Sequence, residues 1–238
     1  MNAQIAKIFS KAVLSEKKIK IKLLGDSITH GVGGTGFKQS GEIIVDGYAR
    51  NPDGYCWANE FKSYMESEFN CEVINNACTG TNIEFVIKNF HKLVDSDDDI
   101  VICTIGTNNR HQYLKDGPRI AKEDYMKRFY ENIITLGNLF RDNNIDFIFV
   151  ANIPAAQENE RDADDYWRIF HMKDVNRMYL KASLECGFPV LSLYSLFMNY
   201  CESKGITVDS LLSDGLHPNN DGHKVMFELI LKEIGIIC

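Results

Sequence analysis

The chain has 238 residues, of which 45% are apolar and 25% charged, and this composition suits one large domain over residues 1–238. Its formal net charge of −7 argues against nucleic acid or an anionic membrane as partner, because both attract clustered Lys and Arg. Seven scattered cysteines without a Cys-x-x-Cys pair are typical of a reduced, cytoplasmic protein, and they predict neither disulfides nor a metal site.

The N-terminal segment predicts an amphipathic helix over residues 2–14. Apolar residues recur there at helical spacing: Ile5, Ile8, Phe9, Ala12 and Val13. We expect this helix to pack on the domain or on a second subunit of a homo-oligomer. A role at a membrane surface is the weaker alternative, because the segment is short and only mildly basic. We expect no signal peptide and no membrane-spanning segment, since no apolar run is long enough.

Residues 19–24 predict the first strand. Lys20 and Lys22 alternate with apolar residues, so we expect their side chains on the solvated face of an edge-like strand. A glycine-rich stretch without clear periodicity follows at residues 30–54. A loop of this length is usually functional, and we expect it to face the substrate, with Tyr48, Arg50 and Asn51 as candidate contacts; a plain surface excursion is the alternative.

The remainder alternates between helical and strand-like patterns. Helices are predicted over residues 55–69, 83–93, 119–143, 166–186, 195–204 and 222–234, and strands over residues 72–75, 100–105, 147–151 and 190–193. We expect an interruption near Gly137, a solvated acidic turn at residues 95–99 and a loop or lid at residues 154–165. Strands separated by helices predict an α/β fold, with a parallel sheet covered by helices on both faces.

Three polar segments directly follow predicted strands, at residues 25–27, 75–80 and 106–109. The carboxyl ends of parallel strands meet at one edge of a sheet, and ligands bind beyond that edge. We therefore expect these segments to lie together and to form the functional site.

Ser27 is the candidate nucleophile, since it sits where a buried strand breaks into a turn. His217 can serve as its base, and Asp214 lies three residues earlier, close enough to orient the imidazole. Each residue has a simpler explanation when taken alone, because Ser, Asp and Gly are ordinary turn residues and a lone His often caps a helix. Their joint occurrence is what favours acyl transfer through serine.

Acyl transfer also needs donors that stabilise the developing oxyanion. The candidates are the backbone N–H groups of Ser27 and Ala77 and the side-chain amide of Asn108. For Asn108, the alternative is a turn-forming role beside Asn109.

These segments resemble the blocks of the SGNH hydrolases, also called the GDSL esterase/lipase superfamily. Residues 25–28 read Gly-Asp-Ser-Ile, residues 106–109 read Gly-Thr-Asn-Asn and residues 214–217 read Asp-Gly-Leu-His. The resemblance implies a flavodoxin-like three-layer α/β/α sandwich with a five-stranded parallel sheet. It also implies a serine esterase without metal or cofactor that uses Ser27, Asp214 and His217, with Asn108 in the oxyanion hole.

Two positions depart from the family pattern. Ala77 stands where the family supplies a glycine N–H to the oxyanion hole, and Gly80 is the alternative alignment. Asn109 stands where the family usually has Asp, which puts the geometry of this loop in doubt more than the chemistry.

The resulting hypothesis is hydrolysis of short acyl esters, acetyl first, on a polar alcohol such as a carbohydrate. Polar residues near the expected site are candidate substrate contacts, and no long apolar stripe is present to hold an acyl tail: Asp26, Tyr48, Asn51, Arg110 and His111. The alternatives are a lysophospholipase, thioesterase or acyltransferase of the same fold, and a non-catalytic binding module. The last of these predicts that at least one catalytic residue is missing, and none is.

Overall fold

The structure, a computed structural model, describes residues 3–236 of the chain. Asn2, with which the predicted N-terminal helix begins, and the last cysteine, Cys238, lie outside this range. Within the range, the side chain of Ala12 is not described.

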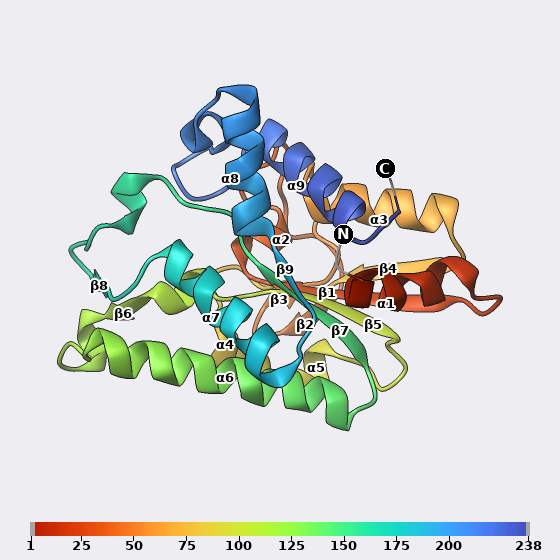
Figure 1. Ribbon diagram of the computed structural model, residues 1–238, viewed down its shortest axis with the longest axis horizontal. Coiled ribbons are helices and arrows are strands. Elements are labelled where there is room, and N and C mark those ends of the chain that lie inside the picture. The colour runs from red at the N-terminus through yellow and green to blue at the C-terminus, as the bar shows by residue number, and fades with distance from the viewer. Residues whose placement is uncertain (1–2, 237–238) are drawn as a thin grey trace.

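The centre of the molecule is a five-stranded parallel sheet (Figure 1). Its strands are β1 (Ile19–Gly25), β4 (Cys71–Asn75), β5 (Ile100–Thr104), β7 (Asp146–Ala151) and β9 (Val190–Ser192). They lie in the order β4-β1-β5-β7-β9, which is the doubly wound arrangement of flavodoxin-like folds. Every residue of β5 is buried, because helices cover both faces of the sheet. The predicted α/β fold is thereby confirmed.

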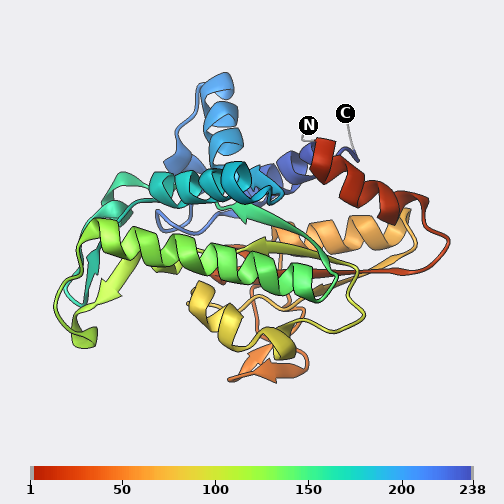
Figure 2. The ribbon, with the colours of Figure 1, turned by 60° about the horizontal axis from the view of Figure 1, so that its bottom comes forward.

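Helices form a layer on each face of the sheet, and each layer has its own hydrophobic cluster (Figure 2). One layer contains α1 (Ala3–Leu14), α3 (Trp57–Glu68), α8 (Leu193–Lys204) and α9 (Asn220–Glu233). The other contains α4 (Ile83–Lys88), α5 (Phe90–Leu93), α6 (Lys122–Asp142) and α7 (Met172–Cys186). Short helical turns complete the chain: α2 (Ser27–His30), η1 (Thr107–Arg110), η2 (Leu114–Asp116), η3 (Gln157–Glu160) and η4 (Val208–Leu211).

The N-terminal helix α1 packs on its own chain. Ile5, Ile8 and Phe9 are buried, and the ring of Phe9 meets that of Phe61 edge-on at 6.4 Å between centroids. The apolar face of α1 therefore packs on its own domain, which is the first of the two packing partners predicted for it. None of the helices within residues 3–236 combines the length and the apolar character needed to cross a bilayer.

Lys22 is not on a solvated edge strand, which corrects the sequence-based expectation. Strand β1 lies between β4 and β5, and Lys22 is fully buried. Its Nζ lies 2.8 Å from Asp95 Oδ2 and 3.4 Å from Asp98 Oδ1, because a buried ammonium group needs an opposite charge. Asp98 is itself buried, so the acidic turn is only partly solvated. The prediction failed because Lys was read as exposed, whereas this one closes a buried ion pair.

Three other predicted boundaries are corrected. Helix α6 is continuous through Gly137, and the predicted helix over residues 83–93 divides at Asn89 into α4 and α5. Residues 166–168, predicted as helix, instead form strand β8 (Tyr166–Arg168), which pairs antiparallel with β6 (His111–Tyr113). The glycine-rich stretch contains a small hairpin of β2 (Ile43–Val45) and β3 (Tyr48–Ala49).

Candidate active site

Ser27 stands at the first position of the short helix α2, immediately beyond the end of β1. Asp26 caps this helix, because its Oδ1 accepts the Ile28 N–H at 3.1 Å. A Cβ at Gly25 would lie 2.3 Å from Thr104 Oγ1, so only glycine permits the close approach of the two strand ends here. The turn presents the Ser27 hydroxyl, although the residue as a whole is only 5% exposed.

The side chains of Asp214, His217 and Ser27 form a continuous hydrogen-bonded relay. His217 Nε2 lies 2.8 Å from Ser27 Oγ, and His217 Nδ1 lies 2.7 Å from Asp214 Oδ2. The other Asp214 oxygen accepts the N–H groups of Leu216 and His217, at 3.0 Å and 2.8 Å.

The protonation of this relay follows from its hydrogen bonds. Partial burial acts to raise the pKa of Asp214, but hydrogen bonds from His217 and Leu216 outweigh it and hold the pKa below its ordinary value. Since the carboxylate only accepts, His217 Nδ1 carries the proton, and Nε2 is free to accept from the Ser27 hydroxyl.

The 154–165 loop holds the relay turn in place, a role that the sequence did not reveal. Asn159 Nδ2 donates to the carbonyl oxygen of Asp214 at 2.9 Å, and the Ala156 N–H donates to that of Gly215 at 2.7 Å. A Cβ at Gly215 would lie 2.5 Å from Asn159 Nδ2, so the two segments are in close contact. The glycine within Asp-Gly-Leu-His was the only sequence signal of this close approach.

Ala77 does not supply a free oxyanion donor. Its N–H donates to Asn75 Oδ1 at 3.0 Å, and the residue is fully buried. The structure therefore contradicts this part of the prediction. The reason is that the Asn75 side chain folds back over its own turn, as Asn commonly does.

Gly80 supplies the free N–H of this turn. The other N–H groups have partners at 2.9–3.4 Å: Asn76 donates to Leu23 O, Cys78 to Gly25 O, Thr79 to His30 Nδ1 and Thr81 to Cys78 O. The Gly80 N–H has no hydrogen-bond acceptor within residues 3–236. Asn108 reaches the same turn, because its Nδ2 donates to Thr81 O at 2.8 Å. The alternative alignment on Gly80 thus fits the structure and Ala77 does not.

Two predicted contact residues, Asp26 and Arg110, are buried next to the site. Burial raises the pKa of Asp26, against the effect of hydrogen bonds from Thr107 and Ile28. Arg110 is 1% exposed, with its Nη1 2.9 Å from Glu160 Oε2, and burial lowers its pKa to about 10. Neither side chain can reach a substrate without breaking this packing.

The other three predicted contacts also bind the protein itself. Tyr48 Oη donates to Thr79 O at 2.6 Å, and Asn51 pairs with the backbone of Asn75 through bonds of 2.8 Å. His111 belongs to the β6–β8 ribbon, where its ring packs 4.6 Å from that of Tyr166. Burial, together with Arg168 and Arg110, lowers the pKa of His111 to about 4.

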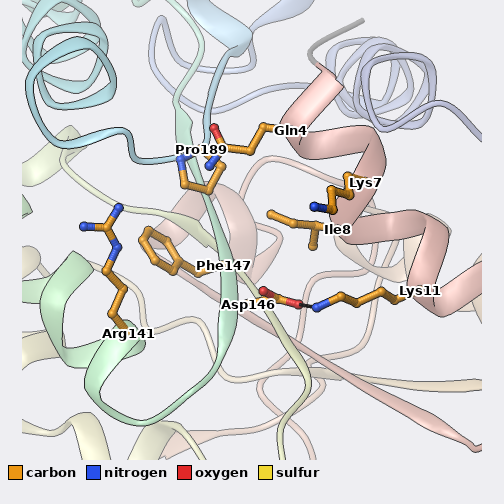
Figure 3. A pocket seen from close by; sticks show the side chains of 8 residues that line it. All are labelled: Gln4, Lys7, Ile8, Lys11, Arg141, Asp146, Phe147 and Pro189. Atoms are coloured by element: carbon orange, nitrogen blue, oxygen red, sulfur yellow. Dashed lines mark hydrogen bonds and ion pairs between the residues drawn. The ribbon is translucent and has the colours of Figure 1, made fainter.

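A cavity of about 290 Å³ lies away from this relay (Figure 3). Lys7, Ile8 and Lys11 of α1 line one side, and Arg141 and Phe147 lie across from them. The cavity is at the beginning of β7, whereas Ser27, Gly80 and Asn108 follow the ends of their strands, so it is on the opposite edge of the sheet. In the part of the chain described here, no three His, Cys, Asp or Glu side chains are grouped to hold a metal ion.

Solved structures with the same fold include esterases, although the sequence identities are low. Axe2, an acetylxylan esterase from Geobacillus stearothermophilus, is 18% identical with a TM-score of 0.66, and 92% of this chain and 95% of that chain are covered. The lipase/acylhydrolase from Enterococcus faecalis is 21% identical with a TM-score of 0.63, and the coverage is 91% and 95%. At these identities the comparison shows the fold alone.

A curated relative is an uncharacterized protein from Mycoplasma pneumoniae, 24% identical over 202 residues. The match includes 83% of this chain but only 19% of the relative, so the chain spans about a fifth of that protein's length. The model of the GDSL-like lipase/acylhydrolase family matches residues 23–225, which include the relay and the oxyanion donors. The chain therefore belongs to the GDSL-like lipase/acylhydrolase family.

Proposed function

We propose that this protein removes short acyl groups, acetyl first, from a polar alcohol such as a carbohydrate, through an acyl-enzyme on Ser27. The observation that carries the proposal is the relay, with 2.7 Å and 2.8 Å between Asp214, His217 and Ser27. Close contact between nucleophile, base and orienting carboxylate is the arrangement that activates a serine hydroxyl.

The proposed reaction begins when Ser27 Oγ attacks the ester carbonyl carbon and His217 Nε2 takes its proton. Asp214 stabilises the imidazolium that forms. The N–H groups of Ser27 and Gly80 and the Asn108 amide stabilise the tetrahedral oxyanion. His217 then protonates the leaving alcohol, and the C–O bond breaks to leave the acyl-enzyme. Water that has lost a proton to His217 attacks this ester, and the acid and free Ser27 result.

The preference for a short acyl group rests on where the exposed apolar side chains lie. Among the described residues, the large ones occur at Val13, Leu14, Ile43, Tyr113, Leu114, Leu180, Leu184, Met198 and Ile206. None is in the segments that contain Ser27, Gly80, Asn108 or His217, so these segments offer no large, fully exposed apolar side chain to an acyl tail. The named activity of Axe2 on acetylxylan also favours an acetylated carbohydrate.

The test is hydrolysis of p-nitrophenyl acetate, butyrate and octanoate by the wild type and by Ser27→Ala, in buffer with a chelator. We expect acetate to give the highest kcat/KM, and Ser27→Ala to lower it by at least about 10³-fold, since the nucleophile is lost. Ser203→Ala is the matched control, because Ser203 is an exposed serine whose hydroxyl, among the described residues, bonds only Tyr200 O, and it should retain full activity.

Acetylated xylo-oligosaccharides, a lysophospholipid and an acyl thioester are then compared as substrates. Preference for octanoate and for the lysophospholipid would reject the short-acyl proposal and favour the lysophospholipase alternative. Equal activity of Ser27→Ala and the wild type would reject the serine mechanism itself.

A further inference from the structure

The orientation of the Thr79–Gly80 peptide decides whether the Gly80 N–H can bind an oxyanion. Tyr48 Oη, from strand β3 of the hairpin, donates to the carbonyl oxygen of Thr79 at 2.6 Å. None of the described peptide bonds is cis, and in a trans peptide the C=O and the following N–H point in opposite directions. The hydrogen bond on the Thr79 carbonyl therefore makes the Gly80 N–H point away from Tyr48.

His30 holds the preceding peptide, Cys78–Thr79, through the Thr79 N–H. His30 Nδ1 accepts the Thr79 N–H at 3.1 Å and lies 2.8 Å from Thr79 Oγ1. Because this ring nitrogen accepts an N–H, His30 is neutral, and burial lowers its pKa to about 4. Tyr48 packs edge-on against both His30 and Phe85, at 6.1 Å between ring centroids in each case.

Gly80 itself offers no resistance to a rotation of this peptide. Its φ is +74°, and a Cβ built on it would meet no atom within 4 Å. Glycine accepts positive and negative φ about equally, so a flip of the Thr79–Gly80 peptide is opposed chiefly by the contacts of Thr79.

We infer that Tyr48 is a positioning residue, which keeps the Thr79–Gly80 peptide oriented so that the Gly80 N–H faces the oxyanion. This inference rests on the esterase function proposed above. Tyr48 itself does not touch the substrate and acts through the peptide. It replaces the sequence-based expectation that Tyr48 is a substrate contact.

The test compares Tyr48→Phe with Tyr125→Phe. Both tyrosines are half-buried and donate to a backbone carbonyl, Tyr125 to that of His111 at 2.9 Å, and Phe keeps both rings in place. One neutral hydrogen bond favours the aligned peptide by roughly ten-fold. We therefore expect Tyr48→Phe to lower kcat/KM for p-nitrophenyl acetate about ten-fold, less than the roughly 10²–10³-fold expected for complete loss of a donor.

Two further readouts separate positioning from a general structural role. Phenylboronic acid forms a tetrahedral adduct with the serine, so its Ki should rise in Tyr48→Phe by about the same factor as kcat/KM falls. The acid limb of the pH–rate profile should stay in place, because the Ser27–His217 pair is unchanged. Tyr125→Phe should remain within about two-fold of the wild type in every readout.

Wild-type kcat/KM in Tyr48→Phe, or a loss of activity without a change in the boronate Ki, would overturn the inference while the esterase proposal stands. Equal inactivity of the wild type and Ser27→Ala would defeat both together. Each comparison is made at a temperature where circular dichroism shows the variants to be folded.

Discussion

Asn109 shows how a single residue adapts the site to its surroundings. Its Oδ1 accepts the Ile83 N–H at 3.0 Å, and its Nδ2 donates to Glu84 Oε2 at 2.7 Å. The other Glu84 oxygen accepts from Asn132 at 2.8 Å. An Asp at this position, as the family pattern usually has, could only accept and would face the Glu84 carboxylate. The departure from the pattern is therefore explained by the neighbouring glutamate.

Asn109→Asp should lower the free energy of unfolding by about 2 kcal/mol at pH 7, because a hydrogen bond to a charged group is lost and two carboxylates are brought together. Urea unfolding measures the change. Glu84→Gln in the same chain is the compensating variant, since a Gln amide can donate to the introduced aspartate, and it should restore most of the loss. Wild-type stability of Asn109→Asp would show that Glu84 does not determine the residue at this position.

Helix α6 illustrates a constraint that acts on a whole element. Gly137 weakens a helix by its intrinsic propensity, yet α6 runs unbroken from Lys122 to Asp142. A Cβ at this position would lie 2.5 Å from the ring of Phe188. Phe188 follows α7 and leads into β9, so Gly137 is present to let this segment pack closely on α6.

Gly137→Ala should destabilise the protein despite the better helix propensity. Ala favours the helix by up to about 1 kcal/mol, but overpacking a core costs about 1–3 kcal/mol. We expect a net loss of about 1 kcal/mol in thermal or chemical unfolding. In the Phe188→Leu background the same change should cost less or become stabilising. An equal loss in both backgrounds would mean that the Phe188 ring is not the obstacle.

The molecule as a whole assembles the site from distant segments by means of the parallel sheet. The ends of β4, β1 and β5 are adjacent in the sheet, and they present Gly80, Ser27 and Asn108 at one edge. His217 reaches Ser27 across 190 positions of sequence, and it lies just before α9, whose apolar residues are part of the hydrophobic cluster of its layer. The packing of α9 must therefore be stable for His217 to stay within reach of Ser27.

His223 makes the stability of this packing sensitive to pH. It is fully buried on α9, and burial lowers its pKa to about 4, against a hydrogen bond to Val32 O that raises it. In the unfolded chain His223 takes up a proton near pH 6.5, whereas in the folded protein it stays neutral down to about pH 4. The contribution of neutral His223 to the free energy of unfolding is therefore fully present above pH 6.5 and is lost as the pH falls toward 4.

Between pH 7 and pH 5, the free energy of unfolding of the wild type should therefore fall by roughly 2 kcal/mol more than that of His223→Gln. Urea unfolding of both proteins at the two pH values measures this difference. The two chains share all other titrating groups. An equal fall in the free energy of unfolding from pH 7 to pH 5 would therefore mean that His223 is protonated in the folded protein.

The alternation of apolar runs and amphipathic segments was enough to predict the parallel α/β fold. Short motifs were enough to select Ser27, Asn108, Asp214 and His217, which the structure brings to one edge of the sheet. Both signals are local: periodicity reports which face of an element is buried, and the motif residues lie on the turns that present them.

Only the tertiary structure decided which partner each polar group meets. The choice of Gly80 over Ala77 depends on Asn75 and on the bonds that occupy the neighbouring N–H groups. The burial of Lys22 depends on Asp95 and Asp98, more than seventy positions away. A hydrogen bond or ion pair between distant segments leaves no periodic pattern in either segment, so the sequence by itself could not determine these contacts.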